Sequence, residues 1–275
     1  MNKVIHCLGD SHTSFFSGSN TIQPLWPKES NDRIPIFKTY RIDASLAYNL
    51  CKTGTTTYGR EKLFNILEKI KKNDIILLSF GEVDCRVHLI KQASLQNKPL
   101  KEIAKECVER YFSVIKEITS LGYTVIIWGA IPTSTSETPI NKDYPSFGSC
   151  FERNHATKLF NEYLSELARK NNIFFLSFFD DLTKNDGLTK RNCLADKTHL
   201  SQRIMPLVVK KIRVLLPEMN IVLFKNTILG KLPWKVQYTL FSIVWNFQDI
   251  LFSLSRKRKD LVFVLKQFIK KLIKK

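Results

Sequence analysis

The sequence lacks several features that mark whole classes of protein. Its 6 cysteines are scattered and include no C-x-x-C pair, which argues against a structural zinc site and against a disulfide framework. No internal repeat or low-complexity block occurs. The apolar run 4–8 is too short for the core of a secretory signal, and no small-residue cleavage site follows it. We therefore expect a protein of the reducing cytosol.

Acidic residues are scarce relative to basic ones. The chain of 275 residues has 43 Lys and Arg against 25 Asp and Glu, a formal net charge of +18. Its hydrophobic content of 44% is enough for a full core, which excludes a disordered protein. Residues 220–275 alone hold 12 basic and 2 acidic residues and so carry +10. A basic tail of this kind indicates an anionic partner, either a lipid surface or a nucleic acid.

Short apolar runs alternate along the chain with segments of helical periodicity. Five runs are predicted as strands: 4–8, 36–42, 74–80, 123–128 and 173–176. Four segments are predicted as helices: 60–71, 100–120, 152–171 and 200–216. Strands that alternate with helices predict an α/β fold, a three-layer α/β/α sandwich around a parallel sheet.

Polar clusters stand where chemistry is expected in such a fold, beyond the carboxyl ends of the strands. If the predicted fold holds, three clusters converge on one edge of the sheet. They are residues 9–13, 81–88 and 196–201.

Ser11 is the candidate nucleophile of the first cluster. A serine hydroxyl is a poor nucleophile unless a base removes its proton, and histidine is the usual base. His199 could be that base, and Asp196 could fix its tautomer by accepting from the imidazole. The structural alternative is that Ser11 caps a helix and Asp196 caps the final one.

Together, the string Gly9-Asp10-Ser11 and the spacing Asp196-x-x-His199 resemble the SGNH (GDSL-type) hydrolase superfamily over residues 1–216. The resemblance implies a flavodoxin-like three-layer fold and ester hydrolysis or acyl transfer. It also implies that Ser11 is the nucleophile and an oxyanion-hole amide, and that Asp196 and His199 complete a triad.

The second and third motifs of that superfamily match less well. Gly54 resembles the glycine of the second motif, another oxyanion donor. The third motif, Gly-x-Asn-Asp, is here Gly81-Glu82-Val83-Asp84, with Val83 in place of the asparagine that donates to the oxyanion. Loss of one such donor costs about 10²–10³ in rate. Arg86 is the nearest candidate to compensate, because a guanidinium can stabilise an oxyanion.

The surroundings of Val83 allow two interpretations. Glu82, Asp84, Arg86 and His88 occupy every second position, and in an extended segment all four would face one way. The alternative is a structural loop in which Glu82 or Asp84 holds Arg86. The string 81–86 also resembles SGNH-like proteins associated with bacterial surface-polysaccharide biosynthesis.

A metal site is a further alternative. The string Gly9 to His12 fits the opening Gly-Asp-x-His of metallophosphoesterases, and Glu82 or Asp84 could add ligands. No Gly-Asn-His-Glu block follows, so we expect neither a metal nor another cofactor. In the serine-enzyme interpretation the remaining polar residues contribute to oxyanion or substrate binding: Gly54, Arg86, Asp10, Glu82, Asp84 and His12.

The sequence predicts two parts, a hydrolase-like domain over 1–218 and a basic amphipathic helical tail over 219–275. Polar residues interrupt 234–255 too often for a confident membrane span. In 260–275, aliphatic residues at helical spacing oppose lysines, which favours an anionic membrane surface contacted through 256–275. The alternative is a helical hairpin packed on the domain. Nucleic acid is not expected, because no recognised binding motif occurs.

The predicted function is that of a serine-dependent ester hydrolase or O-acyltransferase. Its expected substrate is an O-acetyl group on a glycan or glycolipid precursor. The first alternative is a weakly active or inactive SGNH-fold protein that binds glycan or serves as a scaffold at the membrane, and the second is a metallophosphoesterase. We expect a cytoplasmic protein that the tail brings to the inner face of the plasma membrane.

Overall fold

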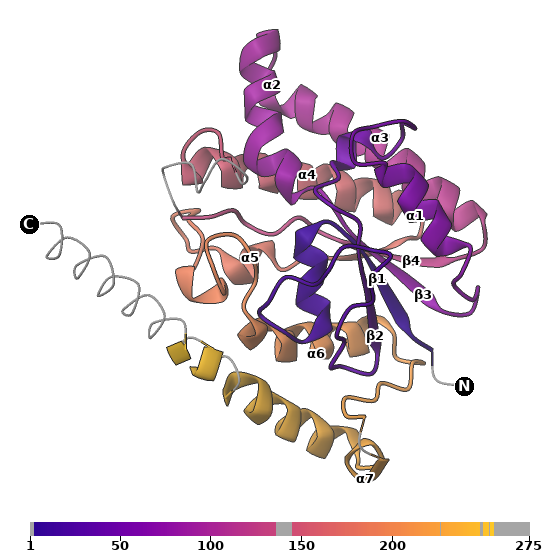
Figure 1. Ribbon diagram of the computed structural model, residues 1–275. Coiled ribbons are helices and arrows are strands. Elements are labelled where there is room, and N and C mark those ends of the chain that lie inside the picture. Colours follow the sequence, from indigo (N-terminus) through magenta and orange to yellow (C-terminus); the bar gives the residue numbers. More distant parts are fainter. Residues whose placement is uncertain (1–2, 136–144, 226, 248–249, 253, 256–275) are drawn as a thin grey trace, which may run out of the picture.

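The computed structural model describes residues 3–135, 145–225, 227–247, 250–252 and 254–255 (Figure 1). The predicted amphipathic segment 256–275 lies outside the described residues.

The described chain forms a parallel sheet of five strands in the order β2-β1-β3-β4-β5. This is the flavodoxin-like order, and it confirms the predicted α/β fold. The central strands are buried on both faces, which explains their unbroken apolar sequences. The strands are β1 Ile5–Gly9, β2 Phe37–Arg41, β3 Ile75–Ser79, β4 Thr124–Trp128 and β5 Phe174–Leu176.

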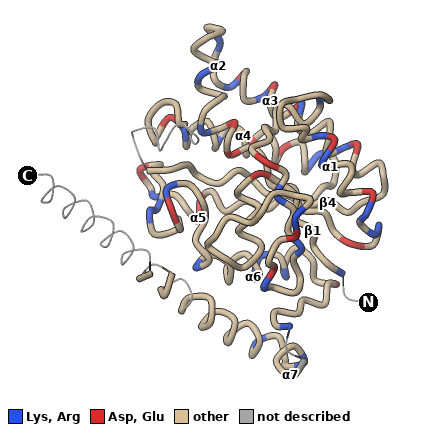
Figure 2. Tube along the Cα trace, in the orientation of Figure 1, with Lys and Arg blue, Asp and Glu red and all other residues tan. Residues whose placement is uncertain are grey.

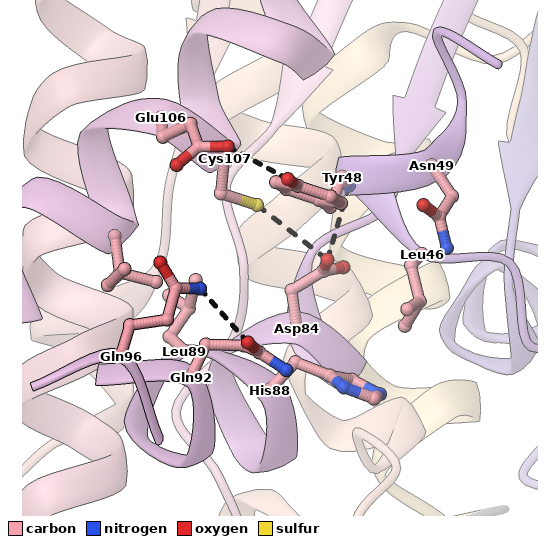
Figure 3. A pocket seen from close by; sticks show the side chains of 11 residues that line it. Leu46, Tyr48, Asn49, Asp84, His88, Leu89, Gln92, Gln96, Glu106 and Cys107 are labelled. Carbon is pink, nitrogen blue, oxygen red and sulfur yellow. Dashed lines mark hydrogen bonds between the residues drawn. The ribbon is translucent and has the colours of Figure 1, made fainter. Parts of the chain in front are cut away.

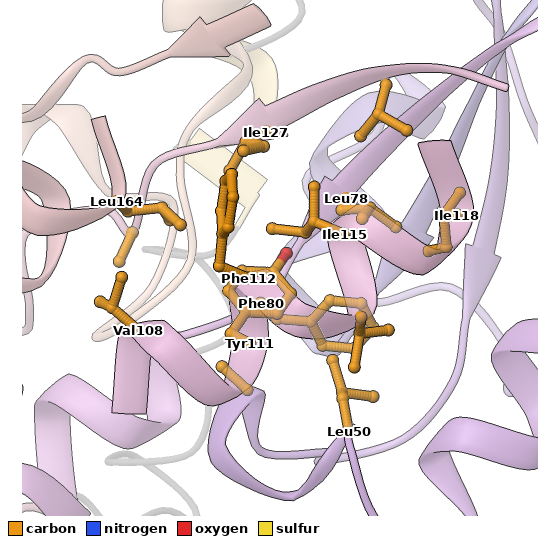
Figure 4. Close-up of a cluster of buried hydrophobic side chains, with 14 of the residues drawn as sticks. Leu50, Leu78, Phe80, Val108, Tyr111, Phe112, Ile115, Ile118, Ile127 and Leu164 are labelled. Carbon is orange, nitrogen blue, oxygen red and sulfur yellow. The ribbon is translucent and has the colours of Figure 1, made fainter. Parts of the chain in front are cut away.

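Helices cover both faces of this sheet and divide the core in two. On one face α1 (Gly59–Leu67), α3 (Leu100–Ser120) and α4 (Cys150–Lys170) bury their apolar sides. Figure 4 shows apolar residues of α3 and α4 in this part of the core. On the other face α6 (Met205–Leu215) packs on β1, β3 and β4. The remaining α-helices are short: α2 Leu89–Gln96, α5 Phe179–Leu182 and α7 Thr227–Gly230.

Short helical turns follow the carboxyl ends of the strands. They include η1 (Ser11–Ser17) after β1, η2 (Ala47–Asn49) beyond β2 and η3 (Asp84–His88) after β3. Two more lie before α6: η4 Arg191–Cys193 and η5 Gln202–Ile204.

The segment after β3 is helical, so the extended arrangement considered for 82–88 is wrong. Gly81 has a φ of +108°, and a Cβ there would lie 2.6 Å from the Phe160 ring. This turn starts a helix at Glu82 that runs through η3 into α2. Glu82 and Arg86 therefore lie one helical turn apart and pair, instead of forming a row with Asp84.

The described part of the segment after Pro217 rests partly on the domain. Helix 234–247 buries Phe241 and Trp245 in the second core, and Trp245 Nε1 donates to Gln202 Oε1 at 3.1 Å. Within the described residues we find no helix both long and apolar enough to cross a membrane.

Candidate active site

The turn after β1 sets the position of Ser11. A Cβ on Gly9 would lie 2.1 Å from the Ser79 carbonyl oxygen, so the close approach of β1 to β3 requires glycine there. Asp10 then caps η1, because its Oδ1 accepts from the His12 amide at 2.8 Å. Ser11 is the first residue of η1, and its amide therefore has no acceptor within that helix.

Ser11, His199 and Asp196 form one chain of hydrogen bonds. His199 Nε2 lies 2.9 Å from Ser11 Oγ, and His199 Nδ1 lies 2.8 Å from Asp196 Oδ2. The other carboxylate oxygen of Asp196 accepts from the amides of Thr198 and His199, each at 2.7 Å. The carboxylate is thus oriented by its own loop, and it orients the imidazole in turn.

The surroundings of this chain favour a neutral imidazole. Burial lowers the pKa of His199, the Asp196 hydrogen bond raises it, and the charge of His12 lowers it further; the net pKa is below the usual value. Burial opposes ionisation of Asp196, but its bonds and charge attraction with His199 outweigh burial and hold its pKa well below the usual range. At neutral pH an unprotonated imidazole therefore lies beside the Ser11 hydroxyl.

A second chain, formed by His12, Glu82 and Arg86, is buried beside the first. His12 Nε2 lies 2.9 Å from Glu82 Oε2, and Arg86 Nε donates to Glu82 Oε1 at 2.8 Å. Arg86 also donates to the Pro145 carbonyl. Burial opposes ionisation of Glu82, but Arg86 and His12 outweigh it and lower the pKa of Glu82 to about 2. Of the two interpretations of residues 82–88, the structure shows the one in which Glu82 holds Arg86.

The two chains meet at their histidines. The His12 ring centroid lies 4.8 Å from that of His199, with the planes tilted by 35°. Burial lowers the pKa of His12, but the charges of Glu82 and Asp10 outweigh it and raise the net pKa above the usual value. His12 therefore holds a proton more readily than the neighbouring His199.

Asp10 and Asp84 have structural contacts. Burial raises the pKa of Asp10 to about 6, and its Oδ1 is used by the η1 cap. Asp84 accepts from the amides of Ala47 and Tyr48 at 2.8 and 3.2 Å, and so holds η2. Its carboxylate thus faces away from the cluster around Ser11 and lines a separate pocket.

The prediction that Gly54 supplies an oxyanion amide is wrong in this structure. The Gly54 N–H donates to Glu61 Oε1 at 2.6 Å, in an exposed turn before α1. Asp43, two residues after the end of β2, has a φ of +119°, a backbone conformation that glycine adopts more readily than other residues. No sequence signal marked it, because aspartate adopts such a φ only under tertiary constraint.

The metal alternative finds no ligand set. In the part of the chain that the structure describes, no group of three or more His, Cys, Asp or Glu side chains is arranged to hold a metal ion. Of the residues considered, His12 instead bonds Glu82, and Asp84 bonds two backbone amides.

Comparison with known proteins identifies the family. The model of the GDSL-like lipase/acylhydrolase family matches residues 5–212. The chain belongs to this family. It is thus an enzyme, a hydrolase of the esterase type. No curated protein matches the sequence.

Several solved structures resemble this chain at low sequence identity. Est24, a carbohydrate acetylesterase from Sinorhizobium meliloti, is 16% identical, with a TM-score of 0.47 over 78% of this chain and 99% of its own. The acetyl xylan esterase AlAXEase is 15% identical, with a TM-score of 0.45 over 78% and 100%. A GDSL-like lipase from Bacteroides thetaiotaomicron is 13% identical, with a TM-score of 0.47 over 76% and 87%. Such similarity concerns the fold alone.

Proposed function

We propose that the chain is a serine-dependent ester hydrolase or O-acyltransferase in which Ser11 is the nucleophile, His199 the general base and Asp196 its orienting partner. The observation that carries the proposal is the unbroken chain of hydrogen bonds from Ser11 Oγ through His199 to Asp196. An acyl-enzyme mechanism of this type requires a hydroxyl, an imidazole and a carboxylate in this order, which supports the proposal.

The proposed reaction has two halves. Ser11 Oγ bonds to the acyl carbon while its proton passes to His199 Nε2, and Asp196 stabilises the imidazolium. The carbon–oxygen bond of the ester then breaks, the leaving alcohol takes the proton from His199, and an acyl-Ser11 remains. Water or an acceptor hydroxyl repeats the step in reverse: His199 takes its proton, its oxygen bonds to the acyl carbon, and Ser11 regains its proton.

The oxyanion of each tetrahedral intermediate requires donors, and Val83 cannot be one. We assign the first to the free Ser11 amide at the start of η1. We assign a longer-range contribution to His12, whose protonated form the charges of Glu82 and Asp10 favour at the same edge. Asp10 supports both by capping η1.

The proposed substrate is an O-acetyl group on a glycan or its lipid-linked precursor. Support comes from the likeness of residues 81–86 to SGNH-like proteins associated with surface polysaccharides. Hydrolysis and transfer share the acyl-enzyme and differ in whether water or a sugar hydroxyl accepts the acyl group. The alternative, an inactive glycan-binding scaffold, follows if Val83 leaves the oxyanion too weakly stabilised.

A fluorophosphonate probe tests the assignment of Ser11. We expect covalent labelling of the wild-type chain, none of Ser11→Ala, and unchanged labelling of Ser94→Ala, an exposed serine on α2. Acetate release from an O-acetylated oligosaccharide should follow the same pattern. A folded wild-type chain that neither labels nor releases acetate would favour the scaffold.

We also propose that residues 219–275 form a basic segment that brings the domain 1–218 to the cytoplasmic face of an anionic membrane. Residues 219–247 contain no acidic residue (Figure 2). The outer face of helix 234–247 leaves Ile243 61% and Phe247 59% exposed, although Phe241 and Trp245 on its inner face are buried. Exposed apolar side chains beside lysines suit the headgroup layer.

Sedimentation with liposomes of phosphatidylglycerol and phosphatidylcholine tests this proposed membrane binding. We expect the wild-type chain to bind and a double Ile243→Ser, Phe247→Ser variant to bind more weakly. Leu95→Ser should bind like wild type, because Leu95 is 69% exposed but lies on α2, at the other end of the molecule (Figure 1). Equal binding of all three proteins, or concentration-dependent dimerisation without lipid binding, would overturn the proposal.

A further inference from the structure

A pocket of about 320 Å³ opens between η2, the η3–α2 segment and α3, apart from the Ser11 cluster (Figure 3). Its volume is at the lower end of the range for ligand sites, enough for one small ring and too little for a long chain. Eleven residues line it: Leu46, Tyr48, Asn49, Asp84, His88, Leu89, Gln92, Gln96, Ile103, Glu106 and Cys107.

The lining combines an apolar wall with a polar rim. Leu46, Leu89 and Ile103 supply aliphatic surface, and Asn49, His88, Gln92, Gln96 and Glu106 supply hydrogen-bonding groups. Neither lysine nor arginine is among the lining residues. A phosphate or other anion would therefore enter without a countercharge. The two carboxylates of the lining already accept hydrogen bonds, Glu106 from the Tyr48 hydroxyl and Asp84 from two backbone amides. The remaining lining suits an uncharged ligand with hydroxyl groups around an apolar ring face.

Several of these polar groups keep hydrogen-bonding capacity for a ligand. Gln96 Nε2 donates to Gln92 Oε1 at 3.0 Å, which leaves the Gln92 amide nitrogen and the Gln96 carbonyl oxygen for other partners. Burial lowers the pKa of His88, so its neutral ring offers one donor and one acceptor. Hydroxyl groups of a sugar both donate and accept hydrogen bonds, so they can pair with the donors and the acceptors of these side chains.

The pocket and the proposed catalytic residues share one edge of the sheet. Ser11 follows β1, which lies between β2 and β3. The pocket is built from η2 and from the η3–α2 segment, which follow those two neighbouring strands. Asp84 in its wall is two residues from Glu82, whose carboxylate bonds His12 beside Ser11.

We propose that this pocket binds one uncharged sugar ring of the glycan, next to the ring that carries the ester. The inference rests on the proposed function, since it names a specificity site for the same substrate. Bound there, a neighbouring ring would hold the chain along the edge at which Ser11 stands.

Saturation-transfer and titration NMR on the Ser11→Ala protein test binding without turnover. The probes are the methyl glycosides of glucose, galactose, mannose and N-acetylglucosamine, with glycerol phosphate as an anionic comparison. We expect at least one glycoside to bind with millimolar affinity and glycerol phosphate not to bind. Gln92→Ala and His88→Ala should each weaken the glycoside about tenfold, as loss of one or two hydrogen bonds would.

Lys91→Ala is the matched control, because Lys91 is exposed on the same helix, α2, and is not among the lining residues. It should bind the glycoside like the parent protein. If no glycoside binds, or if the Gln92 and His88 variants bind as tightly as the control, the inference is overturned.

Kinetics separate this inference from the proposed function. In the chain with Ser11 intact, the ratio of kcat/KM for an acetylated disaccharide to that for p-nitrophenyl acetate should fall about tenfold in Gln92→Ala. If the protein is an esterase but this ratio does not change, the proposed function stands and the proposed sugar binding in the pocket is refuted. If the glycoside binds but no esterase activity is detected, the proposed function is refuted and the proposed sugar binding in the pocket stands.

Discussion

Two histidine–carboxylate pairs lie side by side in this molecule, and the pKa values of their histidines are shifted in opposite directions. In the Ser11–His199–Asp196 chain, the side chain of Asp196 is 39% exposed and that of His199 is 12% exposed. In the His12–Glu82–Arg86 chain, the three residues are 3–7% exposed. The first ends on a hydroxyl that can lose a proton, and the second ends on a guanidinium that cannot. Burial lowers the pKa of both histidines. The charges of Glu82 and Asp10 outweigh burial at His12, whereas the charge of His12 adds to it at His199, so the charged neighbours of each imidazole set its pKa.

The largest effect is expected from breaking the first chain at its carboxylate. Asp196→Asn should lower kcat by about 10⁴, because an amide favours the wrong imidazole tautomer and cannot stabilise the imidazolium. Steady-state hydrolysis of p-nitrophenyl acetate measures the loss. The free energy of unfolding should change far less, since Asp196 is partly exposed. A loss of activity below tenfold would argue that His199 is oriented by other groups.

The next effect is expected from breaking the second chain at its centre. Glu82→Gln should destabilise the fold by about 3–5 kcal/mol, because Arg86 and His12 would be left as buried cations without their counterion. Denaturant unfolding at neutral pH measures this loss. Lys170→Gln is the surface control, and because its pair with Glu166 is exposed it should cost under about 1 kcal/mol.

The same variant gives a signed pH dependence. The pKa of Glu82 is about 2 in the folded chain against an ordinary value of 4.5, so its stabilisation is fully present above the ordinary value. That stabilisation is lost as the pH falls toward 2. The stability difference between wild type and Glu82→Gln should therefore shrink over this window. A constant difference would mean that Glu82 is not the carboxylate held ionised by the pair.

The smallest effect concerns the contact between the two histidines. Activity requires neutral His199, whose pKa lies below 6.5, so the acidic limb of kcat/KM should have its midpoint below pH 6.5. Asp196 and Glu82 raise this pKa, and the charge of His12 lowers it. His12→Gln removes that charge and should move the limb to higher pH. A limb that moves to lower pH would contradict a cationic His12 beside the base.

Much of the fold could be predicted from local sequence. The buried runs around 75–79 and 124–128 became central strands, and the periodicity of 100–120 became α3 with the expected bounds. For segment 82–88 the sequence leaves two alternatives open, and the structure shows the Glu82–Arg86 pair of one of them in a helix instead of the extended row of the other. The segment's alternation of polar residues fits a strand, but Gly81 turns the chain and a helix begins at Glu82. Alternation alone cannot reveal a turn that a distant side chain, Phe160, shapes.

The proposed site also has parts that could be predicted from the sequence and parts that could not. The residue types of Ser11, Asp196 and His199 and the spacing of the last two suggested their association, and in the structure they form one chain. Gly54 was misplaced because a glycine in a polar string says nothing about which acceptor its amide meets, here Glu61. The distance between the His12 and His199 rings had no counterpart in the sequence at all.

The layer architecture and the family follow from the amino-acid sequence alone, because hydrophobic periodicity and short motifs are local properties of the chain. The basic, apolar character of the last 56 residues also follows from the sequence, because it is a matter of composition. The pKa shifts at the site and the pocket beside α2 arise from the tertiary structure. Both depend on which distant side chains share a buried volume, since desolvation and charge pairing are set by neighbours in space.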